Sequence, residues 1–209
     1  MNPGFLSLIL VSISLILLAS GWRQTLLRGI PHYAILLFFT AWCISSLFHF
    51  QWLDGTEING TVALLSLVIA IVLLGHRSVL SGLHYVSLGL FLASVYYLLK
   101  HLGDLDPFFL PYRSWAGTAI VVALLGSMLI RKAKDQIACL SLALLFGCAF
   151  YRIVHPERLA IPFGGLRFQD EWWLTVVAAR MFSMTGEYAT DAVRTASKSL
   201  VERWKGLRK

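Results

Sequence analysis

Charge is scarce in this sequence. Only 14% of its 209 residues are Asp, Glu, Lys or Arg, whereas 57% are hydrophobic. A soluble domain usually carries about 25% charged residues. The apolar residues also come in long blocks with almost no charge inside them, and a helix that crosses a bilayer needs about 20 such residues. The composition therefore excludes an ordinary soluble protein and predicts a multi-pass membrane protein.

Sequence motifs for nucleotide, metal or acyl-transfer chemistry are also missing. The chain has no P-loop, no Gly-rich dinucleotide turn, no G-x-S-x-G, no H-E-x-x-H and no C-x-x-C. Its three cysteines, Cys43, Cys139 and Cys148, lie in or beside apolar blocks, as buried structural thiols do. We therefore expect no cofactor and favour a non-enzymatic role.

The apolar blocks predict an all-α fold, a polytopic transmembrane helical bundle of about seven spans. The predicted spans are residues 4–21, 32–53, 61–75, 83–100, 114–130, 137–154 and 172–186. They form a transmembrane domain of residues 1–186, followed by a tail of residues 187–209. The seventh span is the weakest of these predictions because it is short and contains Arg180.

The distribution of basic residues predicts the orientation of the chain. Twelve Lys and Arg residues lie on one side of the predicted spans and five on the other, with Arg180 inside the last span. Loops rich in Lys and Arg stay in the cytoplasm. We therefore predict a cell-membrane protein with its N-terminus outside and its C-terminus in the cytoplasm. This topology also accounts for the net charge of +7 without a nucleic-acid partner.

The tail is predicted to be a basic amphipathic helix, because small and apolar residues recur in it at helical spacing. Its charged face carries Arg194, Lys198, Arg203, Lys205, Arg208 and Lys209. Such a helix lies on anionic lipid, where each Lys or Arg gains about 1 kcal/mol. We therefore expect membrane-surface binding to the inner leaflet, with a membrane protein partner as the alternative.

Two stretches of the chain are similar. "HYAILLFFTAWCISSLFH" starts at His32, and "HYVSLGLFLASVYYLLKH" starts at His84. A fainter third unit ends at His155. These similarities suggest three tandem helical hairpins followed by one helix. Chance placement of interface residues is the alternative.

Three histidines, His49, His101 and His155, lie at the predicted outer ends of even-numbered spans. Acids follow in the adjoining loops, among them Asp104 and Asp106. Imidazoles and carboxylates on one side of the membrane are a possible metal or substrate site. The alternative is that histidine is simply an amphipathic interface residue, and the missing local ligand spacing favours that reading.

An arginine inside a span costs several kcal/mol unless it pairs or reaches the interface. Arg180 is such an intramembrane charge, and it is therefore a candidate functional residue. No carboxylate lies in the middle of another span. We expect relief from Glu187, from Ser or Thr hydroxyls, or from backbone carbonyls.

Tryptophans and small residues are expected to position the helices. Trp22, Trp52, Trp115, Trp172 and Trp173 fall at predicted span ends, where indole rings favour the headgroup level. Small residues within the spans are expected to let helices pack closely: Ala70, Gly89, Ala93, Gly126 and Gly147.

The whole chain resembles the YphA family of small multi-pass membrane proteins from spore-forming Gram-positive bacteria. The resemblance lies in the length, the very short N-terminus "MNPGF", the serial short hairpins and the late segment "DEWW". It implies a bacterial cell-membrane location, and it carries no catalytic residue over to this chain.

Three functions are compatible with these features. The leading hypothesis is a non-enzymatic integral membrane component that acts through a partner or through lipids. The first alternative is a small transporter or channel, suggested by the span number and Arg180. The second is a metal-dependent membrane enzyme using the outer histidines and acids.

Overall fold

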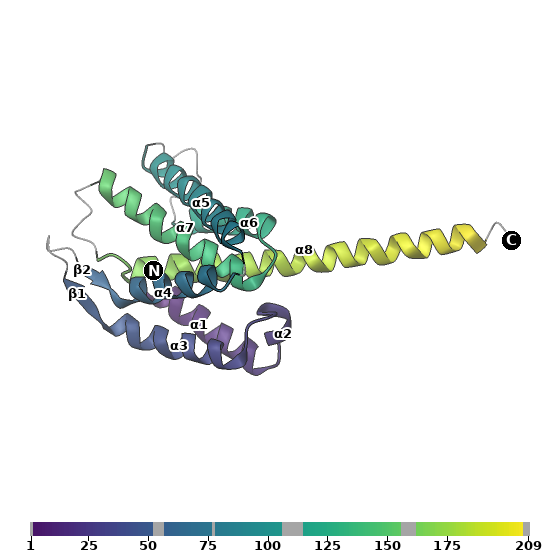
Figure 1. Ribbon diagram of the computed structural model, residues 1–209, viewed down its shortest axis with the longest axis horizontal. Helices are drawn as coiled ribbons and strands as arrows, with labels where there is room; N and C mark the ends of the chain where they lie inside the picture. The colour runs from purple at the N-terminus through teal and green to yellow at the C-terminus, as the bar shows by residue number, and fades with distance from the viewer. Residues whose placement is uncertain (1, 52–56, 77, 106–114, 156–161, 207–209) are drawn as a thin grey trace.

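Helices make up most of the chain, and a short β-hairpin lies at one end of the bundle that they form (Figure 1). This computed structural model describes residues 2–51, 57–76, 78–105, 115–155 and 162–206. The helices are α1 (Phe5–Ala19), α2 (Arg23–Leu26), α3 (His32–Leu47), α4 (Gly60–Leu74), α5 (Val79–Leu105), α6 (Trp115–Leu129), α7 (Ala133–Val154) and α8 (Leu166–Gly206). The strands are β1 (His49–Gln51) and β2 (Glu57–Asn59). The predicted all-α class is confirmed.

The hairpin replaces the end of the second predicted span. We predicted a helix over residues 32–53, but α3 ends at Leu47 and Phe48 has an extended backbone. β1 then pairs antiparallel with β2, with His49 opposite Asn59. Asn59 also caps α4, because its side chain accepts a hydrogen bond of 2.9 Å from the amide of Thr61. We call this end of the bundle the hairpin end and the opposite end, which carries α2, the α2 end.

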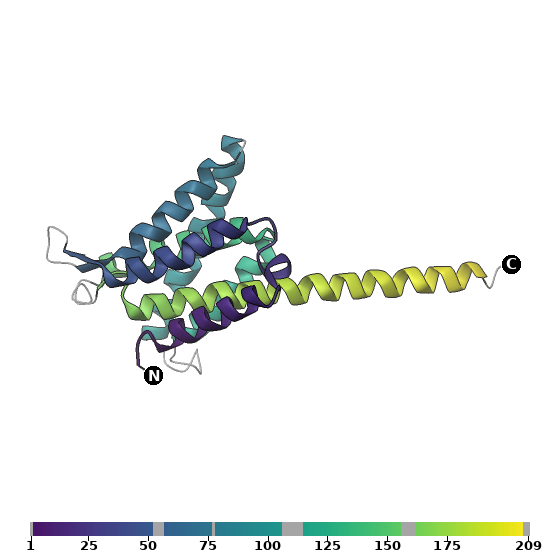
Figure 2. The ribbon, with the colours of Figure 1, turned by 90° about the horizontal axis from the view of Figure 1, so that it is seen from below.

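The last helix is much longer than predicted. We predicted a span at residues 172–186 and a separate tail after it, but α8 continues without a break for 41 residues. No proline interrupts it, and Gly186 has no heavy atom within 4 Å of where a Cβ would lie. At 1.5 Å per residue the helix is about 60 Å long. Figures 1 and 2 show its second half leaving the bundle and extending well past it.

The core of the bundle surrounds α7, in which every residue from Ala138 to Leu145 is buried. α5 packs along α7, and α6 packs along α8. Small residues make this contact possible: a Cβ added at Gly147 would lie 2.4 Å from Cδ1 of Tyr96, and one added at Gly89 would lie 2.2 Å from Cδ2 of Leu142. The predicted role of glycines in close helix packing is confirmed at these positions.

Two tryptophans predicted as interface anchors belong to the core instead. Trp172 and Trp173 are 1% and 4% exposed, and their rings lie 4.7 Å and 5.4 Å from the ring of Trp42 on α3. The prediction is wrong for this pair because α8 begins at Leu166, which places both residues inside the helix rather than at its end. Trp22 is 50% exposed. Trp52 and the side chain of Trp115 lie outside the described part of the chain.

Two helices, Val79–Asp104 and Ala133–Val154, are long and apolar enough to cross a membrane on their own. Four further apolar helices are shorter: Phe5–Ala19, His32–Leu47, Gly60–Leu74 and Ala116–Leu129. Each spans roughly 22 Å, against about 30 Å of hydrocarbon. The helices of the predicted tandem hairpins pack less closely with each other than α5 does with α7, and the repeat stays a prediction.

Candidate functional site

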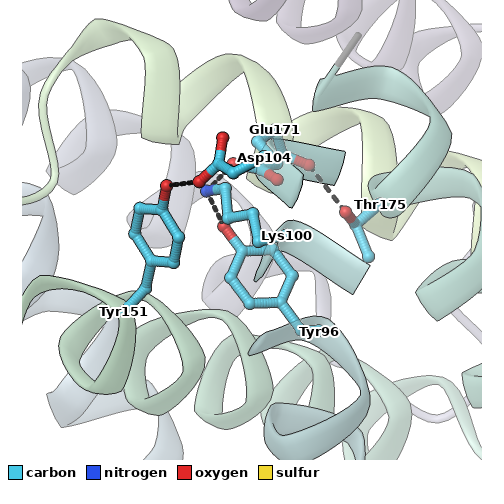
Figure 3. Close-up of polar contacts among 6 residues, drawn as sticks. All are labelled: Tyr96, Lys100, Asp104, Tyr151, Glu171 and Thr175. Atoms are coloured by element: carbon cyan, nitrogen blue, oxygen red, sulfur yellow. Dashed lines mark hydrogen bonds and ion pairs between the residues drawn. The ribbon is translucent and has the colours of Figure 1, made fainter. Parts of the chain in front are cut away.

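Two clusters of polar side chains join the helices of the bundle, and most of their members are buried or partly buried, whereas Asp104 is exposed. The first, at the hairpin end, joins α5, α7 and α8 and consists of Tyr96, Lys100, Asp104, Tyr151 and Glu171 (Figure 3). We call it the Lys100 cluster. The second lies nearer the α2 end and consists of Arg180, Gln136 and Ser183 with the backbone carbonyl of Leu26; we call it the Arg180 cluster.

An ion pair stands at the centre of the Lys100 cluster. Nζ of Lys100 lies 3.1 Å from Oε2 of Glu171 and also donates a hydrogen bond to the hydroxyl of Tyr96. The side chain of Glu171 is only 5% exposed, and that of Lys100 is 25% exposed. A buried carboxylate needs a compensating charge, and Lys100 on α5 supplies it to Glu171 on α8.

Asp104 belongs to the same cluster, where it accepts a hydrogen bond from the hydroxyl of Tyr151 (Figure 3). We proposed Asp104 as part of a metal or substrate site from the sequence, but we named neither Lys100 nor Glu171 as a site residue. The pairing was missed because 71 positions separate the two residues. The only sequence signal was that both charges fall close to the predicted outer end of an apolar block.

The structure brings two of the three candidate histidines together. The ring centroids of His101 and His155 lie 5.7 Å apart, and the ring of Tyr151 lies 4.6 Å from that of His155. His49 belongs to a different network, because its Nε2 lies 3.2 Å from the side-chain nitrogen of Asn59. Asp106 lies outside the described residues. Within the described ranges, no three His, Cys, Asp or Glu side chains are grouped as a metal ion would require. The metal or substrate site stays a prediction.

Arg180 is 5% exposed, and its guanidinium is held by two other parts of the chain. Its Nε donates a hydrogen bond of 2.7 Å to the carbonyl of Leu26, and its Nη1 donates one of 3.0 Å to Oε1 of Gln136. The carbonyl contact is one of the forms of relief that we predicted. The amide of Gln136, which in turn donates to Ser183 at 2.9 Å, was missed because Gln136 looked like a loop residue next to a basic stretch.

A second buried charged group lies on the same turn of α7 as Gln136. Asp135 is 1% exposed, and its Oδ1 lies 3.6 Å from Nε2 of His76. The ring of His76 packs edge-on against Tyr85, with 4.9 Å between centroids. Both polar clusters therefore draw on α7, the most buried helix.

The interior between the two clusters is mostly apolar, with the hydroxyls of Ser141 and Thr175 buried in it. Leu140, Leu144 and Ala179 are fully buried there, and Val176 is 7% exposed. Trp172 spans this layer, and its indole nitrogen donates a hydrogen bond of 2.9 Å to Ser141. An ion that moved from one cluster to the other would have to open this apolar layer.

A cavity of about 530 Å³ opens at the α2 end, between the α2 segment and α8. Arg23 and Arg28 line it from the α2 side, and Glu187 and Asp191 line it from α8. Met184 and Leu27 add apolar surface. The cavity lies next to the Arg180 cluster, because Arg180 donates a hydrogen bond to the carbonyl of Leu26, and the next residue, Leu27, lines the cavity.

Comparison with known protein families decides the class of the molecule. The family model for YphA-like integral membrane proteins matches residues 3–205. The chain belongs to this family. No curated protein and no solved structure matches it. The YphA-like chain is thus an integral membrane protein embedded in a lipid bilayer, as its composition and its resemblance to the family predicted.

The basic residues of the YphA-like tail lie along α8 as far as the structure describes them. Arg194 is exposed, and the backbone at Lys198, Arg203 and Lys205 is helical. Arg208 and Lys209 lie outside the described residues. The helical tail was predicted, but its continuity with the preceding span was not, and membrane-surface binding by these residues stays a prediction.

Proposed function

We propose that this YphA-like protein is a non-enzymatic component of the cell membrane that presents a rigid basic helix to a partner in the cytoplasm. The observation that carries this proposal is the continuity of α8. One helix contributes Trp172 to the core and continues without a break to Gly206, beyond the bundle. The packed half fixes the direction of the free half.

The proposed topology has seven crossings, with α1, α3, α4, α5, α6, α7 and α8 each crossing once. The N-terminus lies outside and the C-terminus in the cytoplasm. The basic bias of the loops at the α2 end supports this orientation. The exposed apolar side chains that cover the shorter helices, such as Leu36, Leu37 and Ile71, also suit contact with lipid.

The part of α8 that follows the predicted span comprises the 20 residues from Glu187 to Gly206, which extend about 30 Å at helical rise. We call it the arm. A helix that crosses the membrane and stays straight cannot also lie flat on the membrane surface. The continuity of α8 therefore favours an acidic protein surface as the partner of the arm, with anionic inner-leaflet lipid as the competing outcome.

Depth measurement separates these two partners. A fluorophore on Ser197→Cys, in a chain whose native cysteines are replaced by serine, reports how close the arm comes to lipid that carries a quencher. In vesicles of phosphatidylethanolamine and phosphatidylglycerol we expect weak quenching at Ser197 and strong quenching at a Tyr33→Cys control, since Tyr33 is 75% exposed at the predicted membrane interface. Equal quenching at both positions would show that the arm lies on lipid.

Photo-crosslinking in cells then tests for a protein partner. A photoreactive residue at Ser197 should give a specific adduct, and Arg194→Gln with Lys198→Gln should remove it. The matched control, Arg131→Gln with Lys132→Gln, neutralises two charges on the same side of the membrane but outside the arm. Loss of the adduct in the control variant as well would contradict the proposal that the arm binds a protein partner. Absence of any adduct in the parent chain would also contradict it.

A small transporter is the second candidate, and the buried charges favour it. The Lys100 and Arg180 clusters both use α7 and α8, and intramembrane charges commonly mark ion pathways. Transport would require the apolar layer around Trp172 to open. Proton or cation flux in vesicles that is present in the parent chain and lost in Glu171→Gln would support this function, and absence of flux in the parent chain would count against it.

A further inference from the structure

The cavity at the α2 end has two walls of opposite charge. Arg23 and Arg28 form a basic wall on and just after α2. Glu187 and Asp191 form an acidic wall, since residues four apart lie on one face of a helix. The formal charges of the two walls sum to zero, and the cavity of about 530 Å³ lies between them.

These four charged side chains do not neutralise each other directly. Within the described part of the chain the ion pairs are those of His76 with Asp135 and Lys100 with Glu171, and neither involves the cavity walls. Arg23 is half-buried, whereas Arg28, Glu187 and Asp191 are exposed. The walls therefore offer hydrogen-bond donors on one side and acceptors on the other.

The buried arginine fixes the distance between the two walls. Arg180 on α8 donates to the carbonyl of Leu26, which lies between Arg23 and Arg28 in the chain. The same bond therefore ties the segment with the basic wall to the helix with the acidic wall. Gly29, which also lines the cavity, has a φ of +86° that turns the chain back after Arg28.

We infer that this cavity binds the headgroup of an aminophospholipid. The guanidinium groups of Arg23 and Arg28 hold the phosphate, for which arginine offers paired N–H donors. The carboxylates of Glu187 and Asp191 accept hydrogen bonds from the primary ammonium group, which has three N–H donors. A purely anionic headgroup meets repulsion from the acidic wall, and a choline headgroup has no N–H to donate.

The position of the cavity suits a lipid. It lies where α1 has ended and α3 has not begun, next to Trp22, which is 50% exposed. Leu27, Ile30 and Met184 give it an apolar side for the start of the acyl chains. The inference rests on the proposed crossing of α8 only for the leaflet that supplies the lipid. It uses Glu187 and Asp191 at the start of the arm and not the basic residues that are proposed to bind a partner.

Native mass spectrometry of the full chain in detergent micelles tests the inference, with equal amounts of phosphatidylethanolamine, phosphatidylcholine and phosphatidylglycerol added. We expect phosphatidylethanolamine to be retained about tenfold more than either other lipid, the difference that one charge-assisted hydrogen bond supplies. Arg23→Gln with Arg28→Gln should remove this retention. Glu187→Gln with Asp191→Asn should abolish the preference over phosphatidylglycerol. Arg131→Gln with Lys132→Gln is the control and should behave like the parent chain.

Equal retention of the three lipids by the parent chain overturns the inference, and this comparison needs no variant to fold. Unchanged selectivity in both cavity variants overturns it as well. Soluble phosphoethanolamine has the same headgroup chemistry without acyl chains. If it displaces phosphatidylethanolamine at an equal concentration, the proposal that the occupant is a lipid is wrong. A reporter fused after Gly206 tests the topology separately, and an exported reporter would contradict the proposed orientation without affecting the lipid comparison in micelles.

Discussion

Ser7 on α1 and Asp170 on α8 are 163 positions apart in the sequence, yet the amide of Ser7 donates a hydrogen bond of 2.6 Å to Oδ1 of Asp170. The other carboxylate oxygen accepts one of 2.7 Å from the amide of Gly4. Asp170 is 4% exposed. The first turn of α1 has no capping side chain of its own, and the last helix of the bundle supplies the cap.

Asp170→Ala is expected to loosen the start of α1, because two backbone amides lose their acceptor and the favourable charge at a helix N-terminus disappears. The expected loss is about 1–2 kcal/mol. Hydrogen exchange in micelles should show faster exchange at Gly4–Ser7 and unchanged protection in α7. Asp170→Asn keeps one acceptor oxygen, so its exchange rate at these amides should lie between those of the parent chain and Asp170→Ala. Unchanged exchange in α1 would show that the cap contributes nothing.

Lys100→Met is expected to destabilise the bundle because it leaves the carboxylate of Glu171 buried without its partner. Removing one member of a buried pair costs about 3–5 kcal/mol, and the partial exposure of Lys100 reduces this to about 2–3 kcal/mol. Unfolding by SDS in mixed micelles measures the difference. The double variant with Glu171→Gln should be more stable than Lys100→Met alone, and strictly additive losses would contradict the ion pair.

Arg180→Lys is expected to cost about 1.5–3 kcal/mol, even though it keeps the charge. A single ammonium group cannot reproduce the two directions in which the guanidinium meets Leu26 and Gln136. The same unfolding assay applies, with Ser183→Ala as a milder control that removes only the outer contact of Gln136. Equal stability of Arg180→Lys and the parent chain would mean that charge alone, and not geometry, matters at this position.

A pair of glycine variants tests the packing of the helices. Gly147→Ala should destabilise by about 1–3 kcal/mol, because its Cβ meets the ring of Tyr96 and the carbonyl of Ala93. Gly186→Ala meets nothing within 4 Å and should stabilise α8 by about 0.5–1 kcal/mol. Thermal unfolding should move in opposite directions for the two variants. A Gly147→Ala variant as stable as the parent chain would contradict the close approach of α5 and α7.

Much of the helical framework could be predicted from the sequence, because lipid imposes long apolar runs that are visible without an alignment. α4 covers Gly60–Leu74 where we predicted residues 61–75, and α6 covers Trp115–Leu129 where we predicted 114–130. The end of α3 was placed too late because Phe50 is as apolar as a span residue. Only the pairing of β1 with β2 shows that it belongs to a strand.

The polar clusters were harder to predict because their members come from distant parts of the chain. Arg180 stood out as a charge in an apolar block, but its partner Gln136 is 44 positions away and uncharged. Glu171 looked like a loop residue because the start of α8 is polar, with Arg167, Gln169 and Asp170 ahead of it. The burial of these groups follows from tertiary packing, which a single sequence does not display.

The continuity of α8 also has a mechanical consequence. One half of the helix is clamped between Glu171 at the hairpin end and Arg180 near the α2 end, and the other half has no such attachment among the described residues. A small tilt of the attached half, between Glu171 and Arg180, therefore produces a much larger sideways displacement at Gly206, the far end of the helix. In the proposed topology, events on the outer face of the membrane would in this way move a cytoplasmic surface without any change inside α8 itself.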